Sequence, residues 1–261
     1  MEFGLCVEMA FASDPFEDRL RKAAEAGFNK VEMWFVDSSF KGEPEELERQ
    51  AGEAGVEITN TVIGSPDGST GGGLTDPGKR DVWLNRARMS IEFTKEAGIP
   101  STIVCTGNVV KGLSEEKMMG SVLDGLGETL NIAEDSGVTL LLEPLNTTYD
   151  HPGYWLTSSD KGADICRRLS SDRMRLLYDC YHMQIMEGDI INHIRRNIDV
   201  IGYFHSAGVP GRHELYKGEI DYPFVIAEIE KLKYGGIFGL EYSPTFDDGE
   251  SVREVLRYLR G

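Results

Sequence analysis

Short apolar runs rich in β-branched and aromatic residues recur along the chain, separated by longer stretches with helical periodicity. A continuous apolar run of four to eight residues is typical of a strand buried on both faces, as in a parallel sheet. Eight such strands are predicted, at residues 3–8, 30–35, 56–63, 101–106, 138–143, 175–179, 201–205 and 237–241. The amphipathic helices predicted around them include residues 16–26, 44–54, 79–97, 115–136, 222–232 and 251–259.

Strand and helix therefore alternate through the chain, and several predicted helices end in glycine just before the next strand, as in "AGEAGV" and "AEDSGV". Glycine at this position stops a helix in the left-handed conformation. Eight β–α units without a linker or a shift in composition predict an α/β fold, a single (β/α)8 TIM barrel made by one domain over residues 1–261. An open doubly wound sheet is the alternative, but no G-x-G-x-x-G follows the first strand.

The charge and composition of the chain exclude some kinds of binding partner. The net charge of −17, from 27 basic and 44 acidic residues, argues against nucleic acid and against an anionic membrane, since both need a basic face. The opening "MEFGLCVEMAFASDP" has the pattern of neither a signal peptide nor a membrane anchor, so we expect a cytoplasmic protein. The four cysteines form no C-x-x-C pair, which favours buried reduced thiols. The oligomeric state stays open, with a homo-oligomer among the options.

The stretch "VTLLLEPLN" shows where chemistry could gather. Its apolar run ends at Glu143, and the proline behind it cannot donate to a sheet ladder, so Glu143 should be at the carboxyl tip of a strand. The next three predicted strands end at Asp179, His205 and Glu241. In such barrels the strand tips converge at the mouth, where active sites form. Three carboxylates and an imidazole facing one another would need a neutralising cation, and this oxygen-rich set suits Mn²⁺, with Mg²⁺ or Co²⁺ as alternatives, better than zinc.

Each of these residues also has an ordinary structural interpretation. An acidic residue at a strand end often caps the following helix, and for one residue alone that interpretation is at least as good as metal binding. Glu143 and Glu241 closely precede prolines, in "EP" and "EYSP", which places them before the helix starts. His182 could be an ordinary loop histidine and Arg212 a solvated loop charge, while Trp34 is expected to line the core or a cavity.

The segments "LEPLNTTYDHPGYW", "YDCYHMQIMEGDI" and "IGYFHSAGVPGRHE" resemble the hydroxypyruvate isomerase family, within the xylose isomerase-like barrels. The resemblance runs through much of the chain and is densest over residues 138–245. It implies a TIM barrel and an acid/base pair of two glutamates, which by motif are Glu143 and Glu241. Hydroxypyruvate isomerases tend to carry glutamine where this chain has His205. A histidine there is similar to the ketose 3-epimerases, whose substrate-contacting histidine and arginine would match His182 and Arg212.

These observations predict a metal-dependent isomerase that acts through an enediolate on hydroxypyruvate or a similar short 2-keto acid or ketose. A ketose 3-epimerase of the D-tagatose, D-allulose or L-ribulose type is the alternative, because both reactions share the enediolate. An endonuclease IV-like nuclease is a distant alternative, disfavoured by five histidines and the acidic charge. A sugar-binding barrel without activity would be expected to lack one of the two glutamates, and neither is missing.

Overall fold

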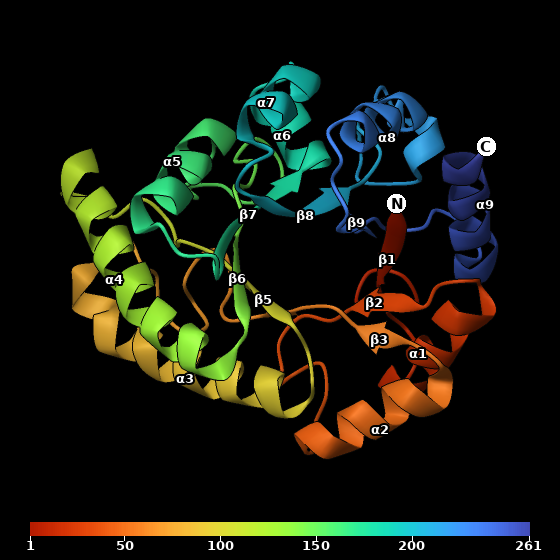
Figure 1. Cartoon of the computed structure of the whole chain (residues 1–261), viewed down its shortest axis with the longest axis horizontal. Helices are drawn as coiled ribbons and strands as arrows, with labels where there is room; N and C mark the ends of the chain where they lie inside the picture. The colour runs from red at the N-terminus through yellow and green to blue at the C-terminus, as the bar shows by residue number, and fades with distance from the viewer.

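The predicted strands form one parallel sheet with the order β3-β2-β1-β9-β8-β7-β6-β5-β4 in the computed structural model, which describes all 261 residues. The strands are β1 (Glu2–Cys6), β2 (Lys30–Glu32), β3 (Glu57–Ile58), β4 (Thr61–Val62), β5 (Ser101–Val104), β6 (Thr139–Leu142), β7 (Met174–Asp179), β8 (Ile201–Ser206) and β9 (Ile237–Leu240). Figure 1 shows them as a ring with the helices outside it, which is the predicted TIM barrel.

The helices fill the intervals between strands and follow the last one. They are α1 (Phe16–Glu25), α2 (Pro44–Ala54), α3 (Arg80–Glu96), α4 (Glu115–Ser136), α5 (Ser159–Leu169), α6 (Cys180–Met186), α7 (Ile190–Asn197), α8 (Tyr222–Lys231) and α9 (Asp248–Arg260), with short 3-10 turns η1 (Pro77–Lys79) and η2 (Leu215–Lys217). The glycine stops are as expected, because Gly55 and Gly137 both follow their helices with a positive φ. No helix combines the length and the apolar character that a membrane crossing needs.

The third predicted strand, residues 56–63, is not continuous, and that detail of the prediction is wrong. It divides into β3, which pairs with β2, and β4, which pairs with β5. Between them the Thr59 amide donates to the carbonyl of Val31, and the Met33 amide donates to the carbonyl of Asn60. This segment therefore bonds to both of its neighbours and closes the ring. Strongly curved strands keep a regular ladder only over short lengths, so closure divides the pairing here.

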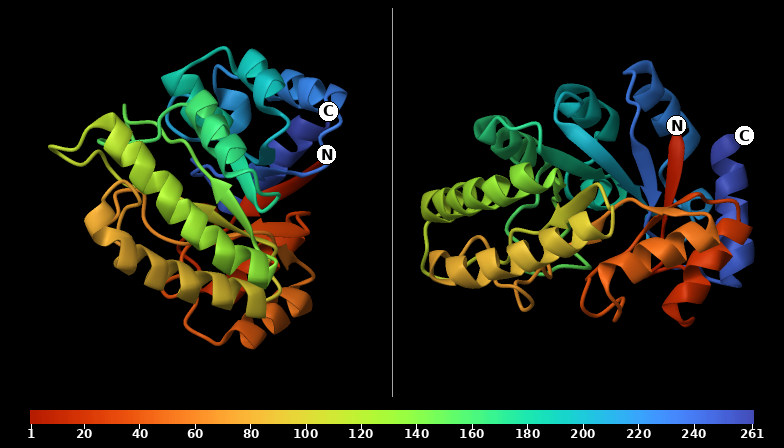
Figure 2. Two further views of the ribbon diagram at one scale, coloured as in Figure 1. Left: turned by 60° about the vertical axis from the view of Figure 1, so that its left-hand side comes forward. Right: turned by 60° about the horizontal axis from the view of Figure 1, so that its bottom comes forward.

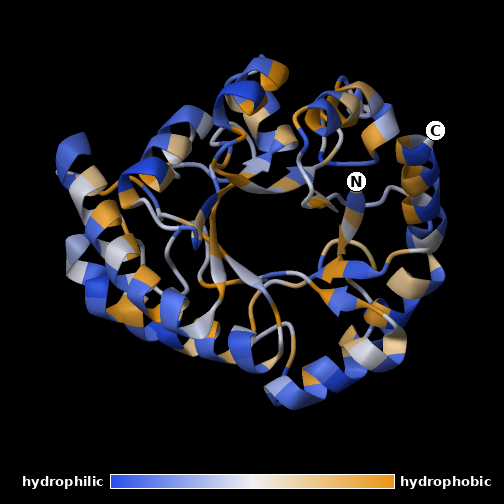
Figure 3. Cartoon of the chain, in the orientation of Figure 1, coloured by the Kyte–Doolittle hydropathy of each residue, from blue (hydrophilic) through white to orange (hydrophobic).

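The hydrophobic core lies mainly between the strands and the surrounding helices. One cluster of 71 buried residues includes Leu20, Trp83, Leu126 and Val252 from the inner faces of four different helices. Figure 3 shows the apolar sides of the outer helices turned toward the strand ring and the polar sides turned outward. Helices α3 and α4 lie side by side along one flank of the barrel (Figure 2). This rigid ring fixes the positions of the residues at its strand ends.

Candidate active site

The four side chains that the sequence predicts as metal ligands lie together at the carboxyl ends of consecutive strands. Glu143 directly follows β6, and Asp179 is the last residue of β7. His205 is in β8, and Glu241 directly follows β9. All four are buried, and one ligand atom from each lies within 4.8 Å of those of the others. The group could hold a metal ion, while the role of each residue stays a prediction.

Asp179 serves two purposes with its two carboxylate oxygens. Oδ1 accepts hydrogen bonds from the backbone amides of Tyr181 (2.7 Å) and His182 (3.2 Å), so it caps helix α6. Oδ2 is buried and makes no hydrogen bond, with His182 Nε2 3.5 Å away. The capping interpretation weighed from the sequence thus accounts for only one oxygen. A buried carboxylate oxygen without a partner is costly, and a cation among the four residues would satisfy it.

The charged groups of this cluster lie close enough to shift one another's pKa. His205 Nδ1 lies 3.3 Å from Glu143 Oε1 and 3.5 Å from Glu241 Oε2. Burial alone would lower the pKa of the His205 imidazole, but Glu32, Glu241 and Glu143 outweigh it and raise that pKa well above its usual value. Burial also raises the pKa of Glu143 and of Asp179. The site therefore favours positive charge at its centre.

Glu241 is held by two donors from other loops. The Arg212 guanidinium donates to Oε2, and the Trp34 indole N–H donates to Oε1 at 3.2 Å. Burial disfavours the charged carboxylate, but Arg212 and His205 outweigh this and hold the pKa of Glu241 below its usual value. Arg212 is not a solvated loop charge, since its side chain is only 17% exposed. It lies over the ring of Tyr181, 5.5 Å from the centroid, and its Nε is buried without a partner.

His182 is on helix α6 rather than in a loop, and its side chain is fully buried. Its Nδ1 accepts from the backbone amide of Asn146 (3.3 Å) and lies 2.7 Å from the side-chain nitrogen of Asn146. The Asn146 oxygen accepts from the amides of Tyr149 and Asp150, which orients its NH₂ group toward the histidine. Burial lowers the pKa of His182 well below the usual value. Because Nδ1 accepts from Asn146, the ring proton is on Nε2, which lies 3.5 Å from Asp179 Oδ2 and makes no hydrogen bond.

A cavity of about 190 Å³ opens above the four residues. Glu143 and Glu241 form part of its wall together with His182 and Arg212. The remaining lining residues are mostly apolar: Trp34, Phe35, Val62, Pro66, Ile103, Cys105, Leu145 and His151. A few convergent polar groups in a mostly apolar hollow are typical of a small-molecule site.

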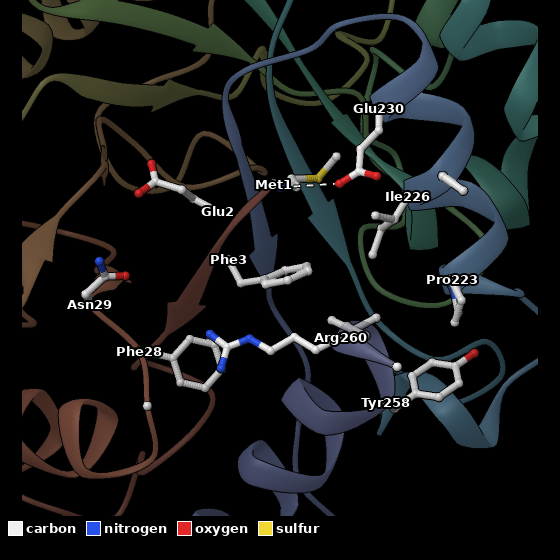
Figure 4. Close-up of a pocket in the computed structure, with 14 residues that line it drawn as sticks. Met1, Glu2, Phe3, Phe28, Asn29, Pro223, Ile226, Glu230, Tyr258 and Arg260 are labelled. Carbon is white, nitrogen blue, oxygen red and sulfur yellow. Dashed lines mark hydrogen bonds and ion pairs between the residues drawn. The ribbon is translucent and has the colours of Figure 1, made fainter.

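A larger hollow of about 670 Å³ lies at the other end of the barrel, beside the start of β1 and the end of α9. Figure 4 shows that Phe3, Phe28 and Tyr258 line it, and that the Met1 amino group pairs with Glu230 across it at 3.3 Å. No acid/base pair or ligand cluster faces it. Since barrel enzymes carry their chemistry at the carboxyl ends of the strands, the smaller cavity is the candidate site.

Sequence reasoning missed Glu32 and Asn146. Glu32 is the last residue of β2, is 1% exposed, and lies 2.7 Å from His205 Nε2. A signal was present, because "KVE" ends an apolar strand with glutamate just as "LLLE" and "FGLE" do. Asn146 follows Glu143 by three residues and gives no signal of its own. Trp34, expected to line the core or a cavity, lines the cavity and bonds Glu241.

Three comparisons place the chain among known proteins. A family model described as a xylose isomerase-like TIM barrel matches residues 20–261. The chain is 31% identical to a 2-oxo-tetronate isomerase from Cupriavidus necator, with 98% of each chain covered. It is 28% identical to a hydroxypyruvate isomerase from Escherichia coli, with 94% of each covered.

Among solved structures, it resembles a D-psicose 3-epimerase from Clostridium cellulolyticum H10 that was crystallised with D-tagatose. The TM-score is 0.85 at 17% identity, with 100% of this chain and 98% of the other covered. At that identity the likeness concerns the fold.

Proposed function

Because the chain belongs to the xylose isomerase-like TIM-barrel family and is an isomerase, we propose that it interconverts hydroxypyruvate, or a similar short 2-keto acid, with its aldehyde isomer. In this proposal Glu143 and Glu241 are the acid/base pair, and Glu143, Asp179, His205 and Glu241 hold a divalent cation, Mn²⁺ in the first instance.

The observation that carries this proposal is Arg212 inside the cavity. An anionic substrate needs a cationic partner for its carboxylate. Arg212 is the one arginine or lysine that lines the cavity. Its Nε is buried and has no partner, so it is available as a donor. Arg212 already pairs with Glu241, and a substrate carboxylate could accept from the Nε donor that this pair leaves over. The site chemistry thus favours an acid over a neutral sugar.

The names of two relatives point the same way. The relatives named 2-oxo-tetronate isomerase and hydroxypyruvate isomerase act, by their names, on acids of this kind.

The residues present fit a divalent cation, since a partnerless buried carboxylate oxygen, two glutamates and an imidazole converge. Such a cation, when bound, polarises the substrate carbonyl and stabilises negative charge on its oxygen. Glu143 and Glu241 follow β6 and β9, three places apart in the ring, so they flank the cavity. One removes a proton from the hydroxymethyl carbon to give an enediolate, and the other returns one to the former carbonyl carbon. The proton of the hydroxymethyl oxygen passes to the former carbonyl oxygen, which leaves the aldehyde. In this proposal Nε2–H of His182, which lines the cavity, donates to a substrate oxygen.

Ketose 3-epimerisation is the second candidate, and His205 favours it. The group of two glutamates, an aspartate and a histidine is the ligand set implied by the resemblance to the ketose 3-epimerases. The same two glutamates would then return the proton to the carbon that lost it, from the opposite face. Arg212 weighs against a neutral substrate, so this reaction takes second place.

Solvent deuterium exchange during turnover decides between the two reactions. Protein loaded with Mn²⁺ is incubated in D₂O with hydroxypyruvate and, separately, with fructose, tagatose and ribulose, and the products are resolved by NMR after the metal is removed. We expect hydroxypyruvate to give tartronate semialdehyde and the three ketoses to stay unlabelled. Glu143→Gln, which keeps the shape of the side chain but removes its basic oxygen, is the matched inactive control.

If hydroxypyruvate is inert while the ketoses take up deuterium at C3 and give their C3 epimers, the epimerase proposal replaces the isomerase proposal. If neither class exchanges in metal-loaded wild-type protein, both proposals are wrong.

A further inference from the structure

Glu32 is a buried carboxylate that the proposed reaction does not use. It is 1% exposed, and both of its oxygens are engaged inside the barrel. Oε2 lies 2.7 Å from His205 Nε2, and Oε1 accepts from the Tyr203 hydroxyl at 3.0 Å. Tyr203 in turn lies 2.9 Å from the Thr59 hydroxyl. These contacts therefore link Thr59, between β3 and β4, to the imidazole of His205.

These contacts fix the roles of the two His205 nitrogens. A carboxylate oxygen only accepts, so Nε2 of His205 carries a proton and donates it to Glu32. The other nitrogen, Nδ1, faces Glu143 and Glu241. Nδ1 is therefore the nitrogen left to face a cation, because Glu32 already accepts from Nε2.

The two strands that lie between β2 and β8 in the sheet, β1 and β9, make room for this carboxylate. Gly4 of β1 and Gly239 of β9 are partners in the sheet register. A Cβ at position 239 would overlap Glu32 Oε1 and come within 2.8 Å of a His205 ring carbon, and a Cβ at position 4 would lie 3.1 Å from Glu32 Oε1. Neither glycine has a positive φ, so the backbone does not require glycine at either place. The two glycines are needed for the space that Glu32 and His205 occupy.

We propose that Glu32 is a positioning residue for metal binding: it holds His205 with the proton on Nε2 and directs Nδ1 to Glu143, Asp179 and Glu241, in a space that Gly4 and Gly239 keep open. The proposal rests on the proposed function in that the group binds a divalent cation. A carboxylate behind a ligating histidine fixes the ring and makes the ligating nitrogen more basic. Glu32 itself touches neither the cavity nor the other carboxylates of the group.

The test measures Mn²⁺ binding to the metal-free full-length protein by calorimetry, for wild type and for Glu32→Gln. The amide keeps the size of the side chain but can donate as well as accept, so it no longer fixes the ring. We expect the affinity for Mn²⁺ to fall about 10- to 100-fold. Glu228→Gln is the matched control, because Glu228 is also a buried carboxylate but lies on α8 and pairs with Arg195 and Lys231. It should bind Mn²⁺ as wild type does.

A spectroscopic measurement separates positioning from a general structural effect. With ¹⁵N-labelled histidine and diamagnetic Mg²⁺, wild type should show the His205 Nε2–H proton shifted downfield by its hydrogen bond to Glu32, and Glu32→Gln should lose that shift. His205→Gln identifies the resonance among the five histidines. If Glu32→Gln fails to fold, Tyr203→Phe, which frees one oxygen of Glu32, is measured instead and should weaken Mn²⁺ binding by a smaller factor.

An affinity within twofold of wild type, or an unchanged Nε2–H signal in the variant that folds, overturns the proposal. If wild type binds no Mn²⁺, the proposed metal dependence is wrong. The Nε2–H signal of the metal-free protein then still reports whether Glu32 holds His205, so the two failures are distinguishable.

Discussion

Replacing Arg212 with alanine tests the choice of an acid as substrate most directly. The guanidinium is largely buried in the cavity wall, pairs with Glu241 and has a free Nε donor. If it binds the substrate carboxylate, Arg212→Ala leaves that carboxylate without a counter-charge inside a mostly apolar cavity. The variant should therefore lose affinity for hydroxypyruvate.

The magnitude follows from the environment of the pair. Two unit charges about 4 Å apart attract by about 4 kcal/mol at an effective dielectric constant of about 20. The cavity is open to water on one side, so part of this attraction is recovered by solvation when the arginine is missing. A charged hydrogen bond contributes about 1.5–3 kcal/mol net. We therefore expect KM for hydroxypyruvate to rise by roughly 10- to 150-fold.

The assay compares kcat and KM for hydroxypyruvate in wild type, Arg212→Ala and Arg212→Lys, each with its Mn²⁺ content measured. Lysine restores the charge but not the planar two-pronged donor, so Arg212→Lys should lie between the other two. Arg257→Ala is the control, since it removes one positive charge from a side chain that is 74% exposed on α9. Its kinetics should match those of wild type.

Because Arg212 also holds Glu241, a fall in kcat alone would report disturbed acid/base chemistry and not carboxylate binding. The reasoning is refuted if Arg212→Ala leaves KM for hydroxypyruvate unchanged while Mn²⁺ stays bound. It is equally refuted if Arg212→Ala turns over a neutral ketose as efficiently as wild type turns over hydroxypyruvate.

Three further predictions concern the acid/base pair, the metal group and a structural carboxylate. Glu143→Gln and Glu241→Gln should each lower kcat by about 10²- to 10⁴-fold, and near wild-type turnover with metal present would remove that residue from the mechanism. Asp179→Asn should contain no Mn²⁺ by elemental analysis but should keep the α6 cap. Asp179→Ala should lose the metal and, in urea unfolding, also about 1 kcal/mol of stability, because the cap is removed. Metal content equal to that of wild type in both variants would contradict the assignment. Burial opposes ionisation of Glu214, but hydrogen bonds from the Thr245 amide and hydroxyl outweigh it and lower its pKa from 4.5 to about 2. The stability lost in Glu214→Gln should thus be constant above pH 4.5 and disappear as the pH falls toward 2, and a loss that grows at low pH would show the opposite sign.

Some parts of the site could be predicted because each rests on a local pattern. The apolar run before Glu143 and the proline behind it place that carboxylate at a strand tip, whatever the rest of the fold does. The regular spacing of β–α units then brings Asp179, His205 and Glu241 to the same end of the barrel. Register and side-chain direction follow from the strand period, so four residues suffice to locate the site.

Other parts depend on contacts that no local pattern contains. Glu32 and His205 are 173 residues apart, and their contact needs both the strand register and the space left by two glycines on other strands. The burial of Arg212 depends on the path of its loop back to Glu241, which charge counting over the loop does not reveal. The division of the third strand arises from ring closure, which a linear pattern of apolar residues cannot show.

That division gives the barrel a weakest point. The ladders that join β3 to β2 and β4 to β5 each contain two residue pairs, whereas β5 and β6 are joined by four. A closed ring has no frayed edge, so transient opening should begin at this seam, where the regular ladders are shortest. In the order of the sheet the seam lies opposite β8. Local opening of the ring would therefore be concentrated on the side away from His205. Amide protons of residues 57–62 should exchange with solvent before those of β6 to β9, whose ends carry the four predicted metal ligands.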